Sequence, residues 1–297
     1  MASDSDPALS GPYGAFEVTA VEYLKTLNGG SQAKLIRCSD GGCYVTKFPK
    51  NPQGSRILVN ELIAGQLALR LKLPAPAVRI VKVDDELIRR SDGLAFELPH
   101  GKVSCRPGYC FGSEYPDAYR GLFYDSWPIF HLNEISNFLA FAGILAFDIW
   151  TSNTDLRQVR FFKYHADSMY QVMMVDNGNC FGQAKWRLTK ISYLALYFKN
   201  YRQIDGIDSF EPWLSRIESA IDQELLSNLA KSVPPEWYEP NHDQLYKLLD
   251  ELYARRSQVR EMIWALRREY PSVFPNWKIG EKHGVDCSPP RLLQLQM

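Results

Sequence analysis

Residues 147–182, FDIWTSNTDLRQVRFFKYHADSMYQVMMVDNGNCFG, are the stretch that decides the fold of this 297-residue chain. An apolar segment ends here in a polar run that contains Asp148, Asn153 and Asp155, and a second apolar segment leads directly into Asp176. Carboxylates in such surroundings usually hold a cation or take a proton, because burial makes an unused charge costly. The stretch therefore predicts a site whose chemistry depends on acids.

The composition excludes several classes of protein. Hydrophobic residues make up 45% and charged residues 23%, as in ordinary globular proteins, and 34 basic residues balance 34 acidic ones. This balance argues against an electrostatic nucleic-acid binder. The longest apolar run, 138–147, has ten residues, whereas a membrane-spanning helix needs about 20. The first 14 residues lack the basic start and apolar core of a secretory signal, so we expect a cytoplasmic protein without a membrane span.

The cysteines and histidines do not form a metal-binding pattern. Six cysteines are dispersed without a CxxC pair, and five histidines form neither HxxxH nor HExxH. We therefore expect reduced, structural thiols and no metal site built on Cys or His.

The pattern of residues divides the chain into four segments. We expect a disordered tail over 1–14, a β-rich lobe over 15–115, a helical lobe over 116–277 and a C-terminal tail over 278–297. In the first lobe, β-branched and aromatic runs predict strands at 16–24, 33–37, 43–48, 77–83 and 94–98, and helical spacing predicts a helix at 58–71.

The boundary and the second lobe follow from Gly and apolar content. Residues 107–116 are rich in Gly and aromatics and predict a loop between the lobes. The apolar run 135–150 predicts a buried central helix, and short strands are expected at 161–164 and 170–175. Leucine stripes between 217 and 266 predict the packed helices of this lobe.

A glycine turn connects the first two predicted strands. Asn28, Gly29, Gly30, Ser31 and Gln32 form its tip, where glycines let backbone N–H groups approach an anion. Hairpins also carry Gly-Gly for purely conformational reasons, so both explanations stay open. The chain has no Walker A pattern, which disfavours a P-loop NTPase.

Lys47 and Glu61 form a second candidate pair. Lys47 lies in the third predicted strand, and Glu61 lies in the following helix and could reach it. A strand lysine that is paired with a helix glutamate places its amine on ATP phosphates in protein kinases. Taken singly, each residue is typical of a solvated surface charge.

The order of these parts is more informative than any one of them. A glycine hairpin, a strand Lys, a helix Glu, a buried helix, an Asp in a polar loop and an Asp after a short strand follow one another as in kinases. Phosphoryl transfer needs this set, because an amine and metal ions neutralise phosphate charge while a carboxylate orients the attacking hydroxyl.

On these residues the chain resembles the HipA-like kinases. Residues 30–34 (GSQAK) are similar to the Gly-x-Gln-x-Lys turn of that family, 44–48 (YVTKF) to its lysine strand, 147–155 (FDIWTSNTD) to its catalytic segment and 175–178 (VDNG) to its metal-binding segment. The resemblance covers 15–277. It implies an α+β, two-lobed protein-kinase-like fold with a β-rich N-lobe and a helical C-lobe, distantly similar to phosphoinositide kinases.

The resemblance also implies the roles of individual residues. Asp155 would be the catalytic carboxylate, Asp176 a Mg²⁺ ligand and Lys47 the amine that binds ATP phosphates, with Glu61 orienting Lys47. Gly30, Ser31 and Gln32 would lie over the nucleotide, and residues 111–115 (FGSEY) would lie near the hinge that receives adenine.

One position departs from the family pattern. Members place an Asn five residues after the catalytic Asp, and here that position is Arg160. A rival assignment, Asp148 as catalytic residue with Asn153 five residues on, restores the spacing. We favour Asp155, and we interpret Asp148 as a structural acid. Arg157 and Arg160 would contact phosphate, pair with Asp148 or lie on the surface.

The function implied by the resemblance is transfer of the γ-phosphoryl group of ATP to a hydroxyl, most often a protein Ser or Thr. The departure at Arg160 leaves a second hypothesis, a pseudokinase that binds nucleotide or a partner without transfer. A lipid or small-molecule kinase is a third. Relatives include toxins of toxin–antitoxin systems, so an antitoxin or another regulatory partner is a further expectation. No direct binding to nucleic acid is expected.

Overall fold

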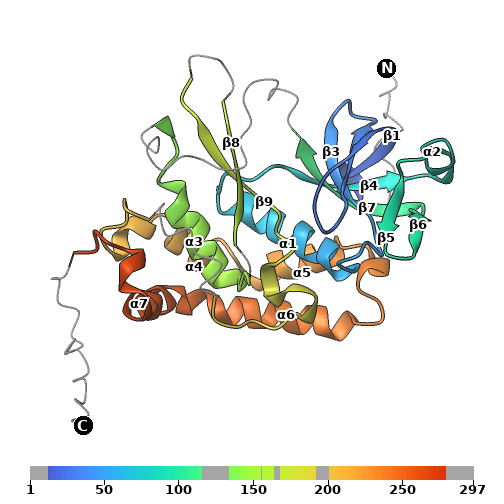
Figure 1. Cartoon of the computed structure of the whole chain (residues 1–297). Coiled ribbons are helices and arrows are strands. Elements are labelled where there is room, and N and C mark those ends of the chain that lie inside the picture. Colours follow the sequence, from blue (N-terminus) through green and yellow to red (C-terminus); the bar gives the residue numbers. More distant parts are fainter. Residues whose placement is uncertain (1–12, 116–133, 155, 164–167, 192–200, 279–297) are drawn as a thin grey trace, which may run out of the picture.

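Strands dominate the N-terminal part of the chain and helices dominate the C-terminal part (Figure 1). The computed structural model describes residues 13–115, 134–154, 156–163, 168–191 and 201–278. Its strands are β1 (Glu17–Thr26), β2 (Lys34–Cys38), β3 (Cys43–Lys47), β4 (Val78–Val83), β5 (Ala95–Leu98), β6 (Gly101–Ser104), β7 (Gly108–Tyr115), β8 (Gln158–Phe162) and β9 (Gln171–Val175).

The helices follow the same division. The α-helices are α1 (Arg56–Arg70), α2 (Asp85–Arg89), α3 (Ala140–Thr151), α4 (Trp213–Ser219), α5 (Gln223–Lys231), α6 (His242–Arg255) and α7 (Val259–Glu269). Short 3-10 segments are η2 (Gly14–Phe16), η5 (Cys180–Lys185), η8 (Ile207–Phe210), η9 (Pro235–Trp237), η10 (Arg256–Gln258) and η11 (Pro271–Val273). The predicted α+β class, with a β-rich N-lobe and a helical C-lobe, is confirmed.

Five strands of the N-terminal part close into a barrel in the order β1-β2-β3-β7-β4. The first three pair antiparallel, as the sequence predicts. The parallel pairing of β1 with β4, which closes the barrel, was not predicted. Because the barrel is closed, each of its strands pairs with a neighbour on both sides. This pairing fixes the position of β3.

Strand β7 corrects the predicted loop at 107–116. Its residues pair with β3 on one side and with β4 on the other. One of the glycines that suggested a loop is needed for close packing: a Cβ on Gly112 would lie 2.5 Å from Cγ2 of Val81. Residues 111–115, the predicted hinge, therefore belong to this strand, and the residues that follow it lie outside the described ranges.

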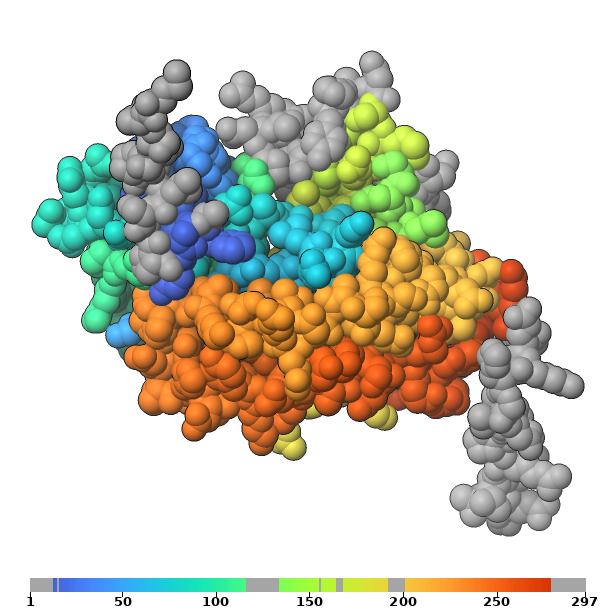
Figure 2. Space-filling view, turned by 180° about the vertical axis from the view of Figure 1, so that it is seen from behind, coloured from blue at the N-terminus to red at the C-terminus, as the bar shows by residue number. Residues whose placement is uncertain are grey.

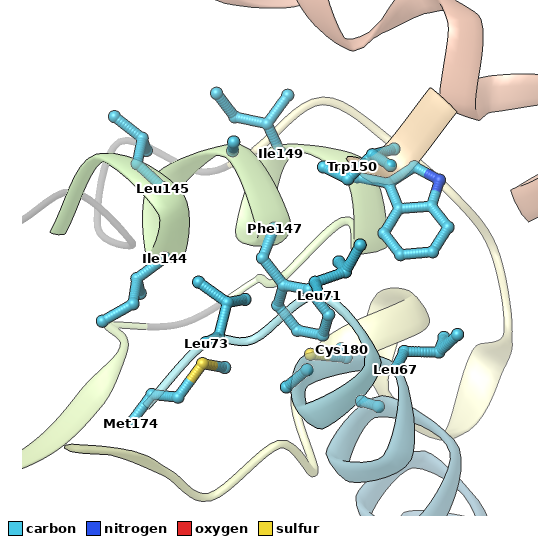
Figure 3. Close-up of a cluster of buried hydrophobic side chains, with 14 of the residues drawn as sticks. Leu67, Leu71, Leu73, Ile144, Leu145, Phe147, Ile149, Trp150, Met174 and Cys180 are labelled. Atoms are coloured by element: carbon cyan, nitrogen blue, oxygen red, sulfur yellow. The ribbon is translucent and has the colours of Figure 1, made fainter. Parts of the chain in front are cut away.

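Helix α1 packs against both parts of the molecule. All of its apolar residues except Leu69 are buried, and one continuous hydrophobic core joins most of them to α3, β9 and the C-terminal helices. Figure 3 shows Phe147 of α3 pointing toward Leu71 and Leu73, with Met174 and Cys180 close by. Seen from behind, the β-rich part rests directly on the orange helical layer (Figure 2). This core fixes α1 relative to the segments that follow α3 and β9.

Helix α3 is shorter than the predicted 135–150 but just as buried. Every residue from Ala140 to Thr151 is buried, and Trp150 donates its Nε1–H to the Leu252 carbonyl at 3.0 Å. The preceding Ile135 instead forms a parallel bridge with Tyr170. The observed β8 and β9 confirm the two short strands that were predicted after this helix.

Five cysteines in the described ranges are buried free thiols, as expected. Burial raises the pKa of Cys38 to about 12 and that of Cys180 to about 11, so both thiols stay protonated and unreactive at neutral pH. No helix in the described part of the chain is long and apolar enough to cross a bilayer. The expected tails, 1–14 and 278–297, fall almost entirely outside the described ranges.

Candidate active site

Lys47, Glu61 and Asp176 meet in one buried cluster. The Lys47 ammonium lies 2.5 Å from Oε1 of Glu61 and 3.0 Å from Oδ1 of Asp176. The side chains of Lys47 and Glu61 are only 7% and 4% exposed, whereas that of Asp176 is 30% exposed. The cluster brings together residues 129 positions apart, and Asp176 is its contact with the surface.

Local structure explains how each member reaches the cluster. Lys47 ends β3 opposite Phe111 of β7, and Glu61 lies in the middle of α1. Asp176 directly follows β9 and has a left-handed backbone conformation with φ +56°. Non-glycine residues adopt that conformation mainly in turns and functional sites, and aspartate tolerates it better than most. The turn directs the Asp176 carboxylate toward the lysine.

The cluster places two carboxylates beside one ammonium, and each of the three groups shifts the pKa of the others. Burial alone lowers the pKa of Lys47, but the two carboxylates outweigh burial and hold that pKa above its ordinary value. Burial raises the pKa of Glu61, and the Lys47 charge offsets this only in part. Burial also raises the pKa of Asp176, but the Lys47 charge and the hydrogen bonds to Glu61, Lys47 and the Gly178 N–H together outweigh it, so that this pKa is lowered. One ammonium shared by two carboxylates favours the arrival of a cation.

Glu61 also ties α1 to the segment that follows β9. Its Oε2 accepts the backbone N–H of Asn177 at 2.8 Å. The backbone at Gly178 passes so close to α1 that a Cβ there would lie 2.7 Å from Cγ2 of Ile57. Glycine is therefore required in the Asp-Asn-Gly sequence for this close approach.

Asn60, the neighbour of Glu61, adds a second connection between the same elements. Its fully buried side chain donates from Nδ2 to the carbonyls of Gly178, Cys180 and Gln183 at 2.9 to 3.1 Å. Its Oδ1 accepts the Nε1–H of Trp186 at 2.8 Å. The amide thus satisfies polar groups along η5 that would otherwise be buried without partners.

Arg157 and Asp148 form a buried ion pair beneath the cluster. Nε of Arg157 lies 3.1 and 3.2 Å from the two carboxylate oxygens of Asp148, and Nη2 also donates to Oδ1. Nη1 of Arg157 donates to the carbonyls of Val175 and Asp176 and to Oδ1 of Asn177. Arg157 is 2% exposed. Of the alternatives that the sequence left open for Arg157, the structure therefore shows the pairing with Asp148.

This ion pair bears on the two assignments of the catalytic residue. Asp148 is 2% exposed and also hydrogen-bonds the side chain of Asn153. Burial raises the pKa of Asp148, and Arg157 offsets this effect only in part. Both residues of the rival assignment are therefore engaged inside the protein. Asp155 lies outside the described residues, so its role stays a prediction.

Arg160 lies in β8, opposite Met173. Its neighbours Val159 and Phe161 point into the core, and side chains alternate along a strand, so Arg160 points to the opposite face and is half-buried. If Asp155 is the catalytic residue, the position at which the family carries an Asn is part of a regular strand here.

The predicted nucleotide turn connects β1 and β2. A Cβ on Gly30 would lie 3.2 Å from Nε2 of Gln53, and Ser31 is 8% exposed. The side chain of Gln32 is hydrogen-bonded to the backbone of Glu97 in β5, at 2.7 and 2.8 Å. The turn lies at the end of the β1–β2 hairpin, and contact of these three residues with nucleotide stays a prediction.

No group of three or more His, Cys, Asp or Glu suited to a metal ion occurs within the described ranges. Mg²⁺ does not require one, because it commonly binds through one or two carboxylates together with waters and substrate phosphates. A partly exposed carboxylate such as Asp176, beside the second carboxylate of Glu61, fits that mode of binding.

Comparison with known proteins places the chain in a family. A family model described as HipA-like kinase matches residues 21–263. The chain belongs to the HipA-like kinase family. Among curated proteins, no sequence matches the chain.

Solved structures show the same fold as this HipA-like kinase. The Helicobacter pylori proinflammatory kinase CtkA aligns with a TM-score of 0.52 at 13% identity, over 82% of this chain and 98% of that one. The Golgi casein kinase aligns with a TM-score of 0.50 at 14% identity, over 85% of this chain and 74% of that one. At such low identity the likeness establishes the kinase-like fold alone.

The supporting residues of this cluster were not predicted from the sequence. The sequence patterns assign no role to Asn60 and Asn177, which are the neighbours of Glu61 and Asp176. Both stand beside a predicted functional residue, which was the available signal. The pairing of Arg157 with Asp148 was one of several alternatives that the sequence left open. A separation of nine residues does not indicate that two side chains form an ion pair.

Proposed function

We propose that this HipA-like kinase is an active, ATP- and Mg²⁺-dependent protein kinase that phosphorylates Ser or Thr. One observation carries the proposal: Lys47 is held by Glu61 and Asp176 in a single buried cluster, at 2.5 and 3.0 Å. Phosphoryl transfer by this fold requires a positioned lysine and a metal-binding carboxylate next to it.

Each residue has a role in the proposed reaction. Lys47 binds phosphate oxygens of ATP, and Glu61 orients its ammonium. Asp176 holds Mg²⁺, which neutralises the charge of the phosphates when bound. Asp155 accepts the proton of the attacking hydroxyl as the γ-phosphoryl group transfers and ADP leaves.

A pseudokinase is the second candidate, and specific observations favour it. Arg160 occupies a regular position in β8, the Asn177 side chain accepts from Arg157, and the Asn153 side chain bonds to Asp148. The amides in this region are therefore engaged with the protein itself. A chain with one metal ligand fewer would bind nucleotide without transferring phosphate.

The test combines labelled ATP with three classes of acceptor. Wild-type protein is incubated with γ-labelled ATP, Mg²⁺ and a degenerate Ser/Thr peptide library, a mixture of phosphoinositides, or small alcohols and sugars. Asp176→Asn is the inactive comparison. Peptide labelling that is lost in the variant supports the proposal. ATP binding by calorimetry without labelling of any acceptor indicates the pseudokinase, and labelling of lipid or small molecules alone indicates the third hypothesis.

Regulation by a bound protein is a further part of the proposal. The resemblance to toxin components suggests an antitoxin or another regulatory partner. Co-purification of the tagged chain with a stoichiometric protein from its own host, followed by reconstitution that suppresses peptide labelling, would support such a partner.

A further inference from the structure

The β5–β6 hairpin has an outer edge that another part of the chain covers. Cys105 donates its N–H to the Leu94 carbonyl at 2.8 Å. These two residues therefore extend the β5–β6 ladder by one hydrogen-bonded pair. Hydrogen bonding alternates along an antiparallel pair, so Phe96 and Leu98 also face β6. The backbone groups of Ala95 and Glu97 therefore point away from β6, toward the β1–β2 hairpin.

Gln32 satisfies both outward groups of Glu97. Its Nε2 donates to the Glu97 carbonyl at 2.7 Å, and its Oε1 accepts the Glu97 N–H at 2.8 Å. The side-chain amide thus forms the two hydrogen bonds that a neighbouring strand would form. Gln32 itself has a left-handed backbone conformation with φ +48°, which turns its side chain out of the β1–β2 ladder.

Lys34 satisfies the outward carbonyl of Ala95. Its ammonium donates to that carbonyl at 2.6 Å and to Oγ1 of Thr26 at 3.0 Å. It also lies 5.7 Å from the centre of the Phe96 ring. Only 1% of Lys34 is exposed, so this cation of the Gly-x-Gln-x-Lys turn is directed into the protein, toward the hairpin.

We infer that Gln32 and Lys34 are positioning residues, which hold the glycine turn at residues 28–32 against the outer edge of β5. The two side chains take the place of a third strand on the β5–β6 hairpin. Because the hairpin lies between β4 and β7 of the barrel in sequence, it is anchored at both ends. The turn is therefore held against the hairpin before nucleotide arrives.

This inference rests on the proposed function for its effect on catalysis. A preformed turn does not lose conformational entropy when its N–H groups bind phosphate, so the affinity for ATP is raised. Gln32 and Lys34 act on the backbone of the turn, and we expect neither side chain to contact the nucleotide.

The decisive variant is Glu97→Pro, because it lies outside the turn. Proline removes the N–H that Gln32 accepts, and it leaves the ladder intact because that N–H does not pair with β6. Gln32→Ala removes both bonds while it keeps a Cβ on the left-handed residue. Glu97→Ala controls for the lost side chain, and Lys102→Pro controls for proline, since Lys102 lies opposite Glu97 and its N–H faces away from the turn.

Two measurements are made on the full chain. Hydrogen exchange of the amides at 28–32 without nucleotide reports the position of the turn directly. We expect faster exchange in Gln32→Ala and Glu97→Pro, and wild-type exchange in both controls. In the kinase assay, the same two variants should raise the KM for ATP about tenfold and change kcat less than about twofold, as expected for one or two net hydrogen bonds.

The outcomes separate this inference from the proposed function. The double variant Gln32→Ala/Glu97→Pro should raise the KM for ATP no further than either single variant does, because both substitutions break the same contact. A raised KM in Gln32→Ala with a normal KM and normal exchange in Glu97→Pro overturns the inference and places Gln32 on the nucleotide. If even the wild type binds no ATP, the proposed function fails, while faster exchange in the two variants still supports the positioning role.

Discussion

Asn177 donates its backbone N–H to Oε2 of Glu61 at 2.8 Å, while Oε1 of the same carboxylate holds Lys47 at 2.5 Å. A single side chain from α1 therefore fixes both the lysine of β3 and the segment that carries Asp176. Since α1 is itself embedded in the continuous hydrophobic core, the cluster is held from three elements at once. Packing of α1 therefore positions both other residues of the cluster.

Replacing Lys47 should abolish phosphotransfer, and it should also lower Tm, because two carboxylates lose their shared counter-charge. Lys47→Met removes the cation shared by Glu61 and Asp176. We expect kcat/KM to fall by about two to three orders of magnitude, as for other groups that stabilise transition-state charge. Peptide labelling measures the loss. The matched control is Lys82→Met, because Lys82 is an exposed lysine on β4, and it should retain wild-type activity.

Asp155 and Asp148 should respond in opposite ways to loss of their charge. Asp155→Asn is expected to lower kcat by at least about a hundredfold with little change in Tm, since proton acceptance contributes about that much. Asp148→Asn is expected to lower Tm, because it leaves the buried Arg157 without its counter-charge. Activity assays and thermal melts of both variants test this. A stable but inactive Asp148→Asn protein would contradict the assignment of Asp155.

The sequence predicted most elements because their local signals agree with the final fold. Strands β1 to β4 and helix α1 lie within a few residues of their predicted positions, since β-branched runs and helical spacing coincide there with burial. Lys47 and Glu61 were paired correctly for the same reason. The order of parts along the chain was sufficient to indicate where they meet.

The errors have a common physical origin in close packing between distant segments. Gly112 looked like a loop residue because its role is to let β7 approach Val81, which no local pattern encodes. The dual contact of Gln32 with Glu97 joins residues 65 positions apart. Such contacts depend on the closed barrel, and the parallel β1–β4 pairing that closes it has no signature in either strand.

Asn60 should be essential for stability although it lies outside the predicted site. Asn60→Leu leaves the indole N–H of Trp186 and three carbonyls of the 178–183 segment without their partner. We expect a loss of about 3 kcal/mol in the free energy of unfolding, the cost of burying unsatisfied polar groups. Urea denaturation measures this loss.

Two further variants identify the cause of that loss. Trp186→Phe removes one donor and should cost about 1 kcal/mol. Asn228→Leu places the same substitution on an exposed position of α5 and should be nearly neutral. If Asn60→Leu lowers the free energy of unfolding no more than Asn228→Leu does, the Asn60 amide does not hold the 178–183 segment together.

Arg157→Met should make stability depend on pH in a defined direction. Removing one partner of a buried ion pair costs about 3 to 5 kcal/mol, and here it leaves the Asp148 carboxylate in an apolar environment. Burial already raises the pKa of Asp148 above the ordinary value of 3.8, and loss of Arg157 raises it further. The folded variant then keeps a proton that the unfolded chain releases. Above pH 3.8 its free energy of unfolding should fall by up to about 1.4 kcal/mol per pH unit, until the pH passes the folded-state pKa.

The double variant Asp148→Asn/Arg157→Met removes the titrating group and should abolish this slope. It should also be more stable at neutral pH than Arg157→Met alone, because no unpaired charge stays buried. Urea denaturation of both proteins between pH 5 and about pH 8 covers the range in which a buried carboxyl changes charge. Equal slopes in the two variants would mean that Asp148 is not the group that Arg157 neutralises. A slope in the single variant alone would establish that the pair holds the segment beneath Asp176 by charge as well as by packing.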